Sequence, residues 1–129
     1  MEERKNFNTT KVIRTNPVFP QAVIVGNLVF LSGTAGIDPA TGKVISDNFE
    51  EQAIQAFTNV KTILEEAGSN IEKIVKTTIF MVAGCDNEFK IINKVYNNFF
   101  PGDAPARSAP KVMPFPGGFL ISVECIALL

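Results

Sequence analysis

The sequence predicts a single α+β domain in which two helices cover one face of a mixed β-sheet. Its 129 residues suffice for one buried core and leave no room for a second domain, so residues 1–129 are expected to form one unit. Two segments, 47–68 and 86–99, repeat apolar residues with the period of a helix. Short segments rich in β-branched residues lie before, between and after them, an order typical of this fold class.

The first part of the chain is expected to form strands joined by tight turns. Residues 9–13 are interpreted as an edge strand. Residues 22–25 and 28–31 are predicted to pair as a hairpin, because Gly26 and Asn27 between them suit a type I′ turn or a close variant of it.

A glycine-containing segment, 32–36, follows the hairpin. Its two glycines allow either a bulge or a close approach of the backbone to a ligand, and the sequence does not decide between them. The composition of residues 38–42 predicts a turn, and residues 43–45 are expected to form a short return strand.

Both helices carry start and stop signals. Asp47 and Glu50 stand in the relation of a capping box, and Gly68 is suited to end the first helix. The second helix is expected to begin at about Asp86 and to end at Pro101. The apolar stripes that we assign to the core are Ala53, Phe57, Val60, Leu64 and Ala67 in the first helix and Phe89, Ile92, Val95, Tyr96 and Phe99 in the second.

Three extended segments complete the predicted sheet. Residues 74–82 are expected to form a long strand with Val75, Thr77, Ile79 and Met81 on one face. Residues 107–112 are predicted to be an edge or interrupted strand, because Pro110 cannot donate to a ladder, and residues 119–129 form the last strand.

The last strand places a carboxylate among apolar residues. Ser122 and Glu124 share one face of it, and we expect Arg107 to be the partner that Glu124 needs, either in a structural ion pair or in a ligand site. An arginine fork matches a carboxylate or phosphate, although spacing alone favours a surface salt bridge. The second face of the sheet is expected to be apolar and therefore covered by another copy of the chain.

Composition excludes several classes of site. Twelve basic and thirteen acidic side chains give a net charge of −1, and the scattered lysines speak against a nucleic-acid surface. The chain has no histidine and two cysteines without C-x-x-C spacing, so we expect no zinc site and no Ser-His or Cys-His nucleophile. No apolar segment has the form of a signal peptide or a membrane span, and a cytoplasmic location is expected.

Five sequence segments together resemble the RidA family, also called the YjgF family, of small enamine/imine deaminases. The resemblance covers almost the whole chain. It implies a chorismate-mutase-like fold, a homotrimer with ligand clefts between neighbouring subunits, and no metal or organic cofactor. The segments are GNLVFLSG at 26–33, NVK at 59–61 with EAG at 66–68, IVKTTIF at 74–80, NKVY at 93–96 with FF at 99–100, and PARS at 105–108.

The same resemblance implies a site for a small carboxylate. The arginine that matches Arg107 grips the carboxylate of a 2-imino or 2-enamino acid released by pyridoxal-phosphate enzymes, and water then displaces ammonia. Gly33 and Ala109 are expected to offer backbone groups. Asn93 is expected in or beside the cleft, and Ser32 at its border.

The chain departs from the family pattern at positions that bear on catalysis. Phe19 stands where deaminating members carry a tyrosine, and Ala109 stands where many carry a cysteine. Ser122 stands where the water-orienting glutamate is expected, while Glu124 matches a second acidic position with at most an indirect role. Serine can hold a water molecule but is not a base near neutral pH.

Three functions are compatible with these residues. The first is hydrolytic deamination of 2-aminoacrylate or 2-iminobutyrate, or of a more apolar relative, with Arg107 and Ser122 as the catalytic pair. The second is a carboxylate-metabolite binding protein or sensor without turnover, which the loss of the glutamate favours. The third is ribonuclease or translation-inhibiting activity, against which the net charge and the scattered lysines speak.

Overall fold

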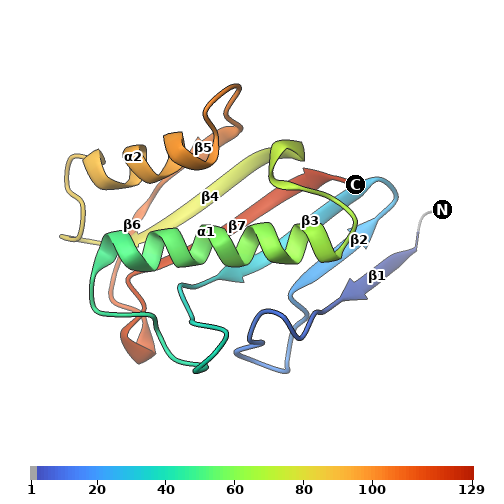
Figure 1. Ribbon diagram of the computed structural model, residues 1–129, viewed down its shortest axis with the longest axis horizontal. Helices are drawn as coiled ribbons and strands as arrows, with labels where there is room; N and C mark the ends of the chain where they lie inside the picture. Colours follow the sequence, from blue (N-terminus) through green and yellow to red (C-terminus); the bar gives the residue numbers. More distant parts are fainter. Residues whose placement is uncertain (1–2) are drawn as a thin grey trace.

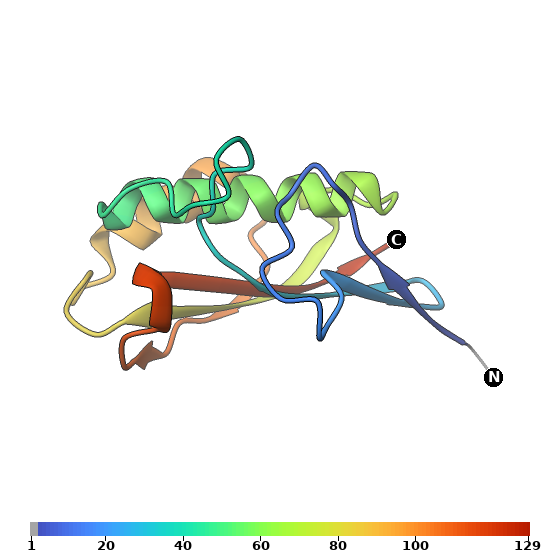
Figure 2. The same cartoon turned by 90° about the horizontal axis from the view of Figure 1, so that it is seen from below.

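The computed structural model describes residues 3–129 and contains one seven-stranded mixed sheet with both helices on the same face (Figures 1 and 2). The strand order is β1-β2-β3-β7-β4-β5, and β6 pairs with β4 beyond β5. Strands β5 and β6 run parallel to β4, and the other neighbours are antiparallel. The predicted fold class is confirmed. The elements are β1 Arg4–Phe7, β2 Ala22–Val25, β3 Leu28–Thr34, α1 Phe49–Glu66, β4 Ile74–Val82, α2 Lys90–Phe99, β5 Ala106–Ser108, β6 Lys111–Val112 and β7 Ile121–Leu128, with short 3₁₀ turns at Ile71–Lys73 and Pro116–Gly118.

Helix α1 has its predicted stop and a corrected start. Gly68 adopts φ 95° directly after the helix, as expected for a glycine that ends one. The N-cap is Asn48 and not Asp47, because Asn48 Oδ1 accepts a hydrogen bond from the Glu51 backbone N–H at 2.9 Å. No helix within residues 3–129 is long and apolar enough to cross a bilayer.

Helix α2 begins four residues later than predicted. Phe89 adopts φ 61° and therefore interrupts helical geometry directly before Lys90. Asp86 lies outside the helix and caps it from there. Its two carboxylate oxygens accept hydrogen bonds from the backbone N–H groups of Ile91 and Ile92 at 3.2 and 2.8 Å.

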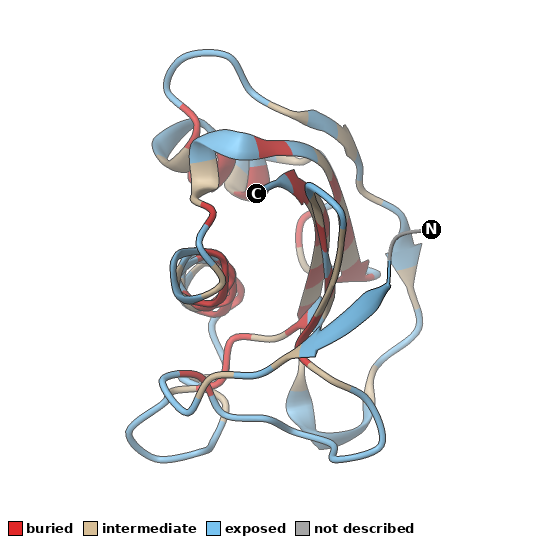
Figure 3. Cartoon of the chain, turned by 90° about the vertical axis from the view of Figure 1, so that its right-hand side faces the viewer, coloured by how far each residue is buried: buried red, intermediate tan, exposed pale blue. Residues whose placement is uncertain are grey.

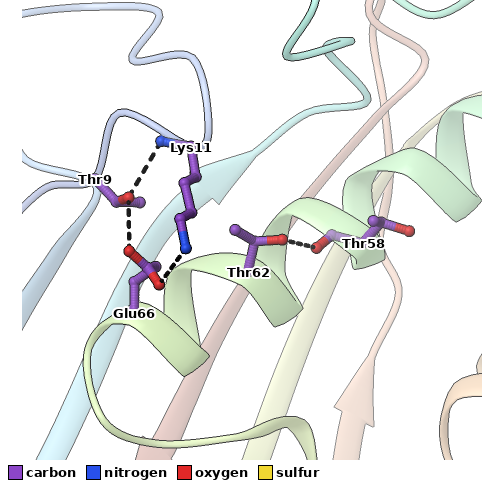
Figure 4. Close-up of polar contacts among 5 residues, drawn as sticks. All are labelled: Thr9, Lys11, Thr58, Thr62 and Glu66. Atoms are coloured by element: carbon purple, nitrogen blue, oxygen red, sulfur yellow. Dashed lines mark hydrogen bonds and ion pairs between the residues drawn. The ribbon is translucent and has the colours of Figure 1, made fainter.

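The predicted edge strand at residues 9–13 is wrong. The edge strand is β1, and residues 9–13 belong to a loop that reaches from the sheet towards α1 (Figure 2). The Gln21 side chain shapes this loop, because it accepts from the Thr9 N–H at 2.7 Å and donates to the Val12 carbonyl at 2.8 Å. Figure 4 shows the same loop held to α1, where Lys11 Nζ lies 3.0 Å from Glu66 Oε2.

Two smaller predictions concern the hairpin turn and the return strand that follows it. The β2-β3 hairpin forms as expected, and its turn has positive φ at Gly26 (57°) but not at Asn27, which is the pattern of type II′, the close variant of type I′. The return strand at 43–45 is reduced to a single bridge between Ile37 and Val44.

The core lies between the two helices and the inner face of the sheet. Buried residues of α1 and of the sheet face each other across this layer (Figure 3). Phe57 is fully buried, and its ring packs edge-on against that of Tyr96 with centroids 5.9 Å apart. Thr77, Ile79 and Met81 share one face of β4 as predicted, and this face is buried in the core. Val75 does not share it: it is 45% exposed, because a register shift between Ile74 and Lys76 turns it outward.

The second face of the sheet is mixed rather than uniformly apolar. On β7 it carries Ser122, Glu124 and Ile126, which are half-buried and alternate with fully inward residues, as the strand period predicts. Phe30 on this face is 40% exposed. The neighbouring positions on β4 are Lys76, Thr78 and Phe80.

Candidate functional site

A β-bulge lies at the point where the glycine-containing segment crosses β7. Leu31 pairs with Cys125 and Thr34 pairs with Val123, so Ser32 and Gly33 together oppose Glu124. Such a bulge leaves a backbone group out of the ladder and redirects neighbouring side chains. The structure therefore contains the bulge that was one of the two interpretations of residues 32–36.

Gly33 lies directly against Ser122. A Cβ atom added at Gly33 would lie 2.6 Å from Ser122 Oγ, which is closer than two such atoms approach. The absence of a side chain at Gly33 thus makes room for the Ser122 hydroxyl. These two predicted site residues, contributed by neighbouring strands, are brought together by the fold.

Phe19, in the loop between β1 and β2, borders the same region, and Ser32 on β3 holds the end of that loop. Ser32 Oγ donates to the Pro20 carbonyl at 2.7 Å, which fixes the end of the loop on β3. The Arg14 guanidinium donates to the carbonyls of Phe19 and Pro17 at 3.0 to 3.2 Å. Phe19, 43% exposed, is held beside the bulge by these contacts.

A small cavity of about 30 Å³ lies between this loop, the bulge and α1. Asn59 braces it from α1: it is buried, and its Nδ2 donates to the carbonyls of Ala35 and Ile37 at 3.1 and 2.9 Å. The sequence patterns did not identify Asn59 as a positioning residue. The available signal was a polar residue on the buried face of α1, at helical spacing from Ala56 and Ile63.

Arg107 lies at the opposite edge of the sheet, on β5. Its Cζ atom is 5.0 Å from the centroid of the Tyr96 ring, a cation–π arrangement. Within residues 3–129 its guanidinium makes no ion pair and no hydrogen bond. A cation that is supported by an aromatic ring and has no acidic partner is suited to bind an anionic ligand.

The expected pairing of Arg107 with Glu124 is wrong. Arg107 is opposite Thr77 and Glu124 is opposite Thr78, which are adjacent positions of β4. Adjacent residues of a strand point to opposite faces of the sheet. Arg107 therefore lies on the helix side, and Glu124 lies on the other side.

Tyr96, which the sequence assigned to the apolar stripe of the second helix, also has a positioning role. Its hydroxyl lies 2.8 Å from Thr77 Oγ1 and donates to the Pro105 carbonyl at 3.2 Å, so it joins α2, β4 and the segment that leads to Arg107. Burial raises the pKa of Tyr96, while the hydrogen bond from Thr77 and the charge of Arg107 oppose this shift. The hydroxyl is thus protonated near neutral pH and acts as a donor.

The remaining predicted residues lie on the Arg107 side. Ala109, between β5 and β6, is half-buried and packs against the core. The Pro110 carbonyl accepts from the Met81 N–H at 3.1 Å, which keeps this interrupted edge on β4. Asn93 is exposed on α2, and its side chain makes no hydrogen bond within the described residues.

The predicted site is therefore divided within one chain. We call Phe19, Ser32, Gly33 and Ser122 the bulge group, and Arg107 with Ala109 the edge group. In the sheet order β3-β7-β4-β5, strand β4 separates the two groups. The cavity beside the bulge group has room for about one water molecule, which is far less than a 2-imino acid needs.

The two cysteines do not supply a nucleophile. Burial raises the pKa of Cys125 to about 12, and burial together with the Asp86 charge raises the pKa of Cys85. Both are therefore thiols near neutral pH, and the thiolate is the reactive form. Residues 3–129 also contain no group of three acidic or cysteine side chains placed to hold a metal ion.

Comparison with known proteins links this arrangement to one family. Residues 9–129 match the family model described as endoribonuclease L-PSP. The chain is 35% identical to the rat 2-iminobutanoate/2-iminopropanoate deaminase over 97% of its own length and 90% of that protein. It is 41% identical over 86% of its length to the chloroplastic Reactive Intermediate Deaminase A of Arabidopsis thaliana, of which it spans 58%.

Solved structures share the same architecture. A putative endoribonuclease L-PSP of Entamoeba histolytica superposes with a TM-score of 0.91 at 35% identity and covers 98% of this chain, which in turn covers all of that chain. TdcF of E. coli, solved with bound serine, superposes with a TM-score of 0.88 at 31% identity, with coverage of 97% and 98%. Because one relative is named as chloroplastic, these similarities do not fix a compartment, and the cytoplasmic location stays a prediction.

Proposed function

Because this chain belongs to the RidA/YjgF/L-PSP family, we propose that it hydrolyses reactive 2-imino or 2-enamino acids to 2-ketoacids and ammonia. The observation that carries the proposal is Arg107, a guanidinium supported by the Tyr96 ring and free of any acidic partner within residues 3–129. Substrates of the 2-aminoacrylate and 2-iminobutyrate type present the small carboxylate that such a group binds in bidentate fashion.

The reaction needs positioning more than strong acid or base catalysis. An enamine first tautomerises to the imine, and Arg107 then holds the carboxylate while water adds to C2 of the protonated imine. The resulting carbinolamine transfers a proton from oxygen to nitrogen, the C–N bond breaks, and ketoacid and ammonia leave. Fixing the substrate beside a held water molecule removes much of the entropic barrier.

We place this reaction between two copies of the chain. The bulge group and the edge group are on different parts of one chain, and the cavity at the bulge is too small for the substrate, so a complete site needs Arg107 and Ala109 of one copy against the bulge group of another. A homotrimer with three such clefts is our expectation for the assembly. The mixed second face of the sheet, with Phe30 exposed, is the surface available for it.

Ser122 sets the expected rate. Its hydroxyl lies against Gly33 and can orient water together with the backbone groups of the bulge, but it cannot act as a base near neutral pH. Glu124 is two residues further on the same face, opposite Ser32 and Gly33, and its role is at most indirect. Turnover is therefore expected to be slow.

A binding protein without turnover is the second candidate. It would keep Arg107 and the cleft, and the neutral Ser122 is the observation that favours it. Nuclease activity, which the description of the family model names, finds less support. The net charge is −1, and three lysines, Lys11, Lys90 and Lys94, are paired with glutamates.

The test is imine hydrolysis with substrates generated in situ. Threonine or serine dehydratase would release 2-iminobutyrate or 2-aminoacrylate, and the rate of ketoacid formation would be measured with and without this protein. The deaminase is supported if the protein accelerates ketoacid formation, if Arg107→Ala abolishes this acceleration, and if Arg4→Ala leaves it unchanged. Binding of 2-ketobutyrate that depends on Arg107, without acceleration, supports the binding protein. If the protein neither binds 2-ketobutyrate nor accelerates ketoacid formation, both the deaminase and the binding protein are refuted.

A further inference from the structure

A second hollow continues from the cavity at the bulge. It has a volume of about 530 Å³ and shares four lining residues with the cavity, so the two form one connected surface. The shared residues are Ile13, Arg14, Thr15 and Ile37. The other residues of the hollow are Gly42, Lys43, Val44, Gly117 and Phe119, and we call the whole the Arg14–Lys43 groove.

The charged residues that line the groove are both cationic. Arg14 comes from the β1-β2 loop and Lys43 from the turn after Asp38, and none of the described acidic residues lines either the groove or the cavity. Lys43 Nζ makes no ion pair or hydrogen bond within residues 3–129. Asp47 and Asp38 are close to Lys43 in the sequence, but neither lines the groove, and the Asp38 carboxylate accepts from the Ala40 N–H at 2.9 Å within its own turn.

Arg14 is held in place without a counter-charge. Its Nε and Nη2 atoms donate to the carbonyls of Phe19 and Pro17, and this fixes the plane of the guanidinium. The two hydrogens of Nη1 have no acceptor within residues 3–129. A guanidinium fixed through one side in this way presents its remaining donors with little loss of side-chain entropy.

Apart from Thr15 and the two glycines, the other side chains of the lining are apolar. Ile13, Val44 and Phe119 line the groove together with the two cations and provide a surface for methylene groups. The cavity adds no negative charge, since its lining among residues 3–129 contains no aspartate or glutamate. The groove is thus suited to a ligand with a short apolar stem and an anionic end.

We propose that the Arg14–Lys43 groove binds a second carboxylate of the substrate, so that the preferred substrates are 2-imino acids of dicarboxylic amino acids. This inference rests on the proposed function, since the groove receives the distal end of a molecule whose first carboxylate is held by Arg107. Lys43 and Nη1 of Arg14 bind the distal carboxylate.

The test uses two stable ketoacids of equal length that differ only at the distal end. 2-Oxoglutarate ends in a carboxylate and 2-oxopentanoate ends in a methyl group. Titration calorimetry of the full chain should show tighter binding of 2-oxoglutarate, by about 2- to 5-fold for each exposed cation. The preference should decrease as salt is raised, because the groove is open to solvent.

Lys43→Gln is the informative variant, since the Lys43 ammonium has no partner within residues 3–129 whose removal could disturb the fold. It should reduce the preference for 2-oxoglutarate by about 2- to 5-fold and leave 2-oxopentanoate binding unchanged. Lys61→Gln, an exposed lysine on α1 outside the groove, is the matched control and should change neither affinity.

Three outcomes overturn the proposal. One is equal or weaker binding of 2-oxoglutarate by the parent protein, and another is a preference that Lys43→Gln leaves intact. If 2-oxopentanoate binding depends on Arg107 in either case, the Arg107 carboxylate site on which the proposed function rests stands, and only the groove assignment fails. In the third outcome neither ketoacid binds, and both proposals fail together.

Discussion

Arg107→Lys separates a ligand clamp from a structural arginine. The substitution keeps the positive charge at the edge of β5 and removes the planar fork that binds two carboxylate oxygens at once. Since Arg107 makes no ion pair or hydrogen bond within residues 3–129, the substitution should disturb the folded chain little.

The expected magnitudes follow from the surroundings of Arg107. Within the chain, the substitution mainly removes the arginine stack 5.0 Å above the Tyr96 ring, so the free energy of unfolding should fall by no more than about 1 kcal/mol. A hydrogen bond to a charged group contributes about 1.5 to 3 kcal/mol to binding. Removal of one such bond weakens ketoacid binding by about 10- to 150-fold.

Calorimetric titration with 2-ketobutyrate measures the affinity, and thermal unfolding followed by circular dichroism measures the stability. Arg4→Lys on β1 is the matched control, because Arg4 is exposed and its Nη2 contacts only Asn6 at 3.3 Å. Unchanged affinity in Arg107→Lys refutes the clamp. A loss of several kcal/mol in stability without a specific effect on binding makes Arg107 structural instead.

Four further predictions test other parts of the site. Ser122→Glu should raise the rate of imine hydrolysis, because a positioned acid or base contributes about 10² to 10⁴-fold. If the variant folds but steady-state kinetics show no faster turnover, this prediction is contradicted. Tyr96→Phe should lower the free energy of unfolding by about 1 to 3 kcal/mol in urea titrations, because it leaves the buried Thr77 hydroxyl without a partner, and Thr77→Val should relieve much of this loss in the double variant. Gly36→Ala should cost about 1 to 3 kcal/mol in the same assay, because its Cβ would lie 2.5 Å from the Gln52 carbonyl oxygen, and an unchanged midpoint would show that the loop yields freely. Sedimentation velocity should find a trimer, and a stable monomer at micromolar concentration would contradict assembly of the cleft between copies.

The sequence alone determined the elements whose signals are local. The bounds of β4, the stop of α1 at Gly68 and the shared face of Ser122 and Glu124 were all predicted correctly. Strand period, helix period and the left-handed preference of glycine act within a few residues, so they can be read without knowledge of the fold. The segments that carry the family resemblance also identified Arg107 as a candidate before its surroundings were known.

Tertiary structure decided every relation between distant segments. Arg107 and Glu124 point to opposite faces because they pair with adjacent residues of β4, and no local pattern encodes that register. Likewise, Gln21 turns residues 9–13 into a loop through hydrogen bonds to Thr9 and Val12, contacts that a propensity for extended structure does not include. The bulge at Ser32 and Gly33 and its contact with Ser122 exist because β3 and β7 pair out of register there. The site thus depends on which strands become neighbours, and long-range burial and pairing determine that choice after the local elements are set.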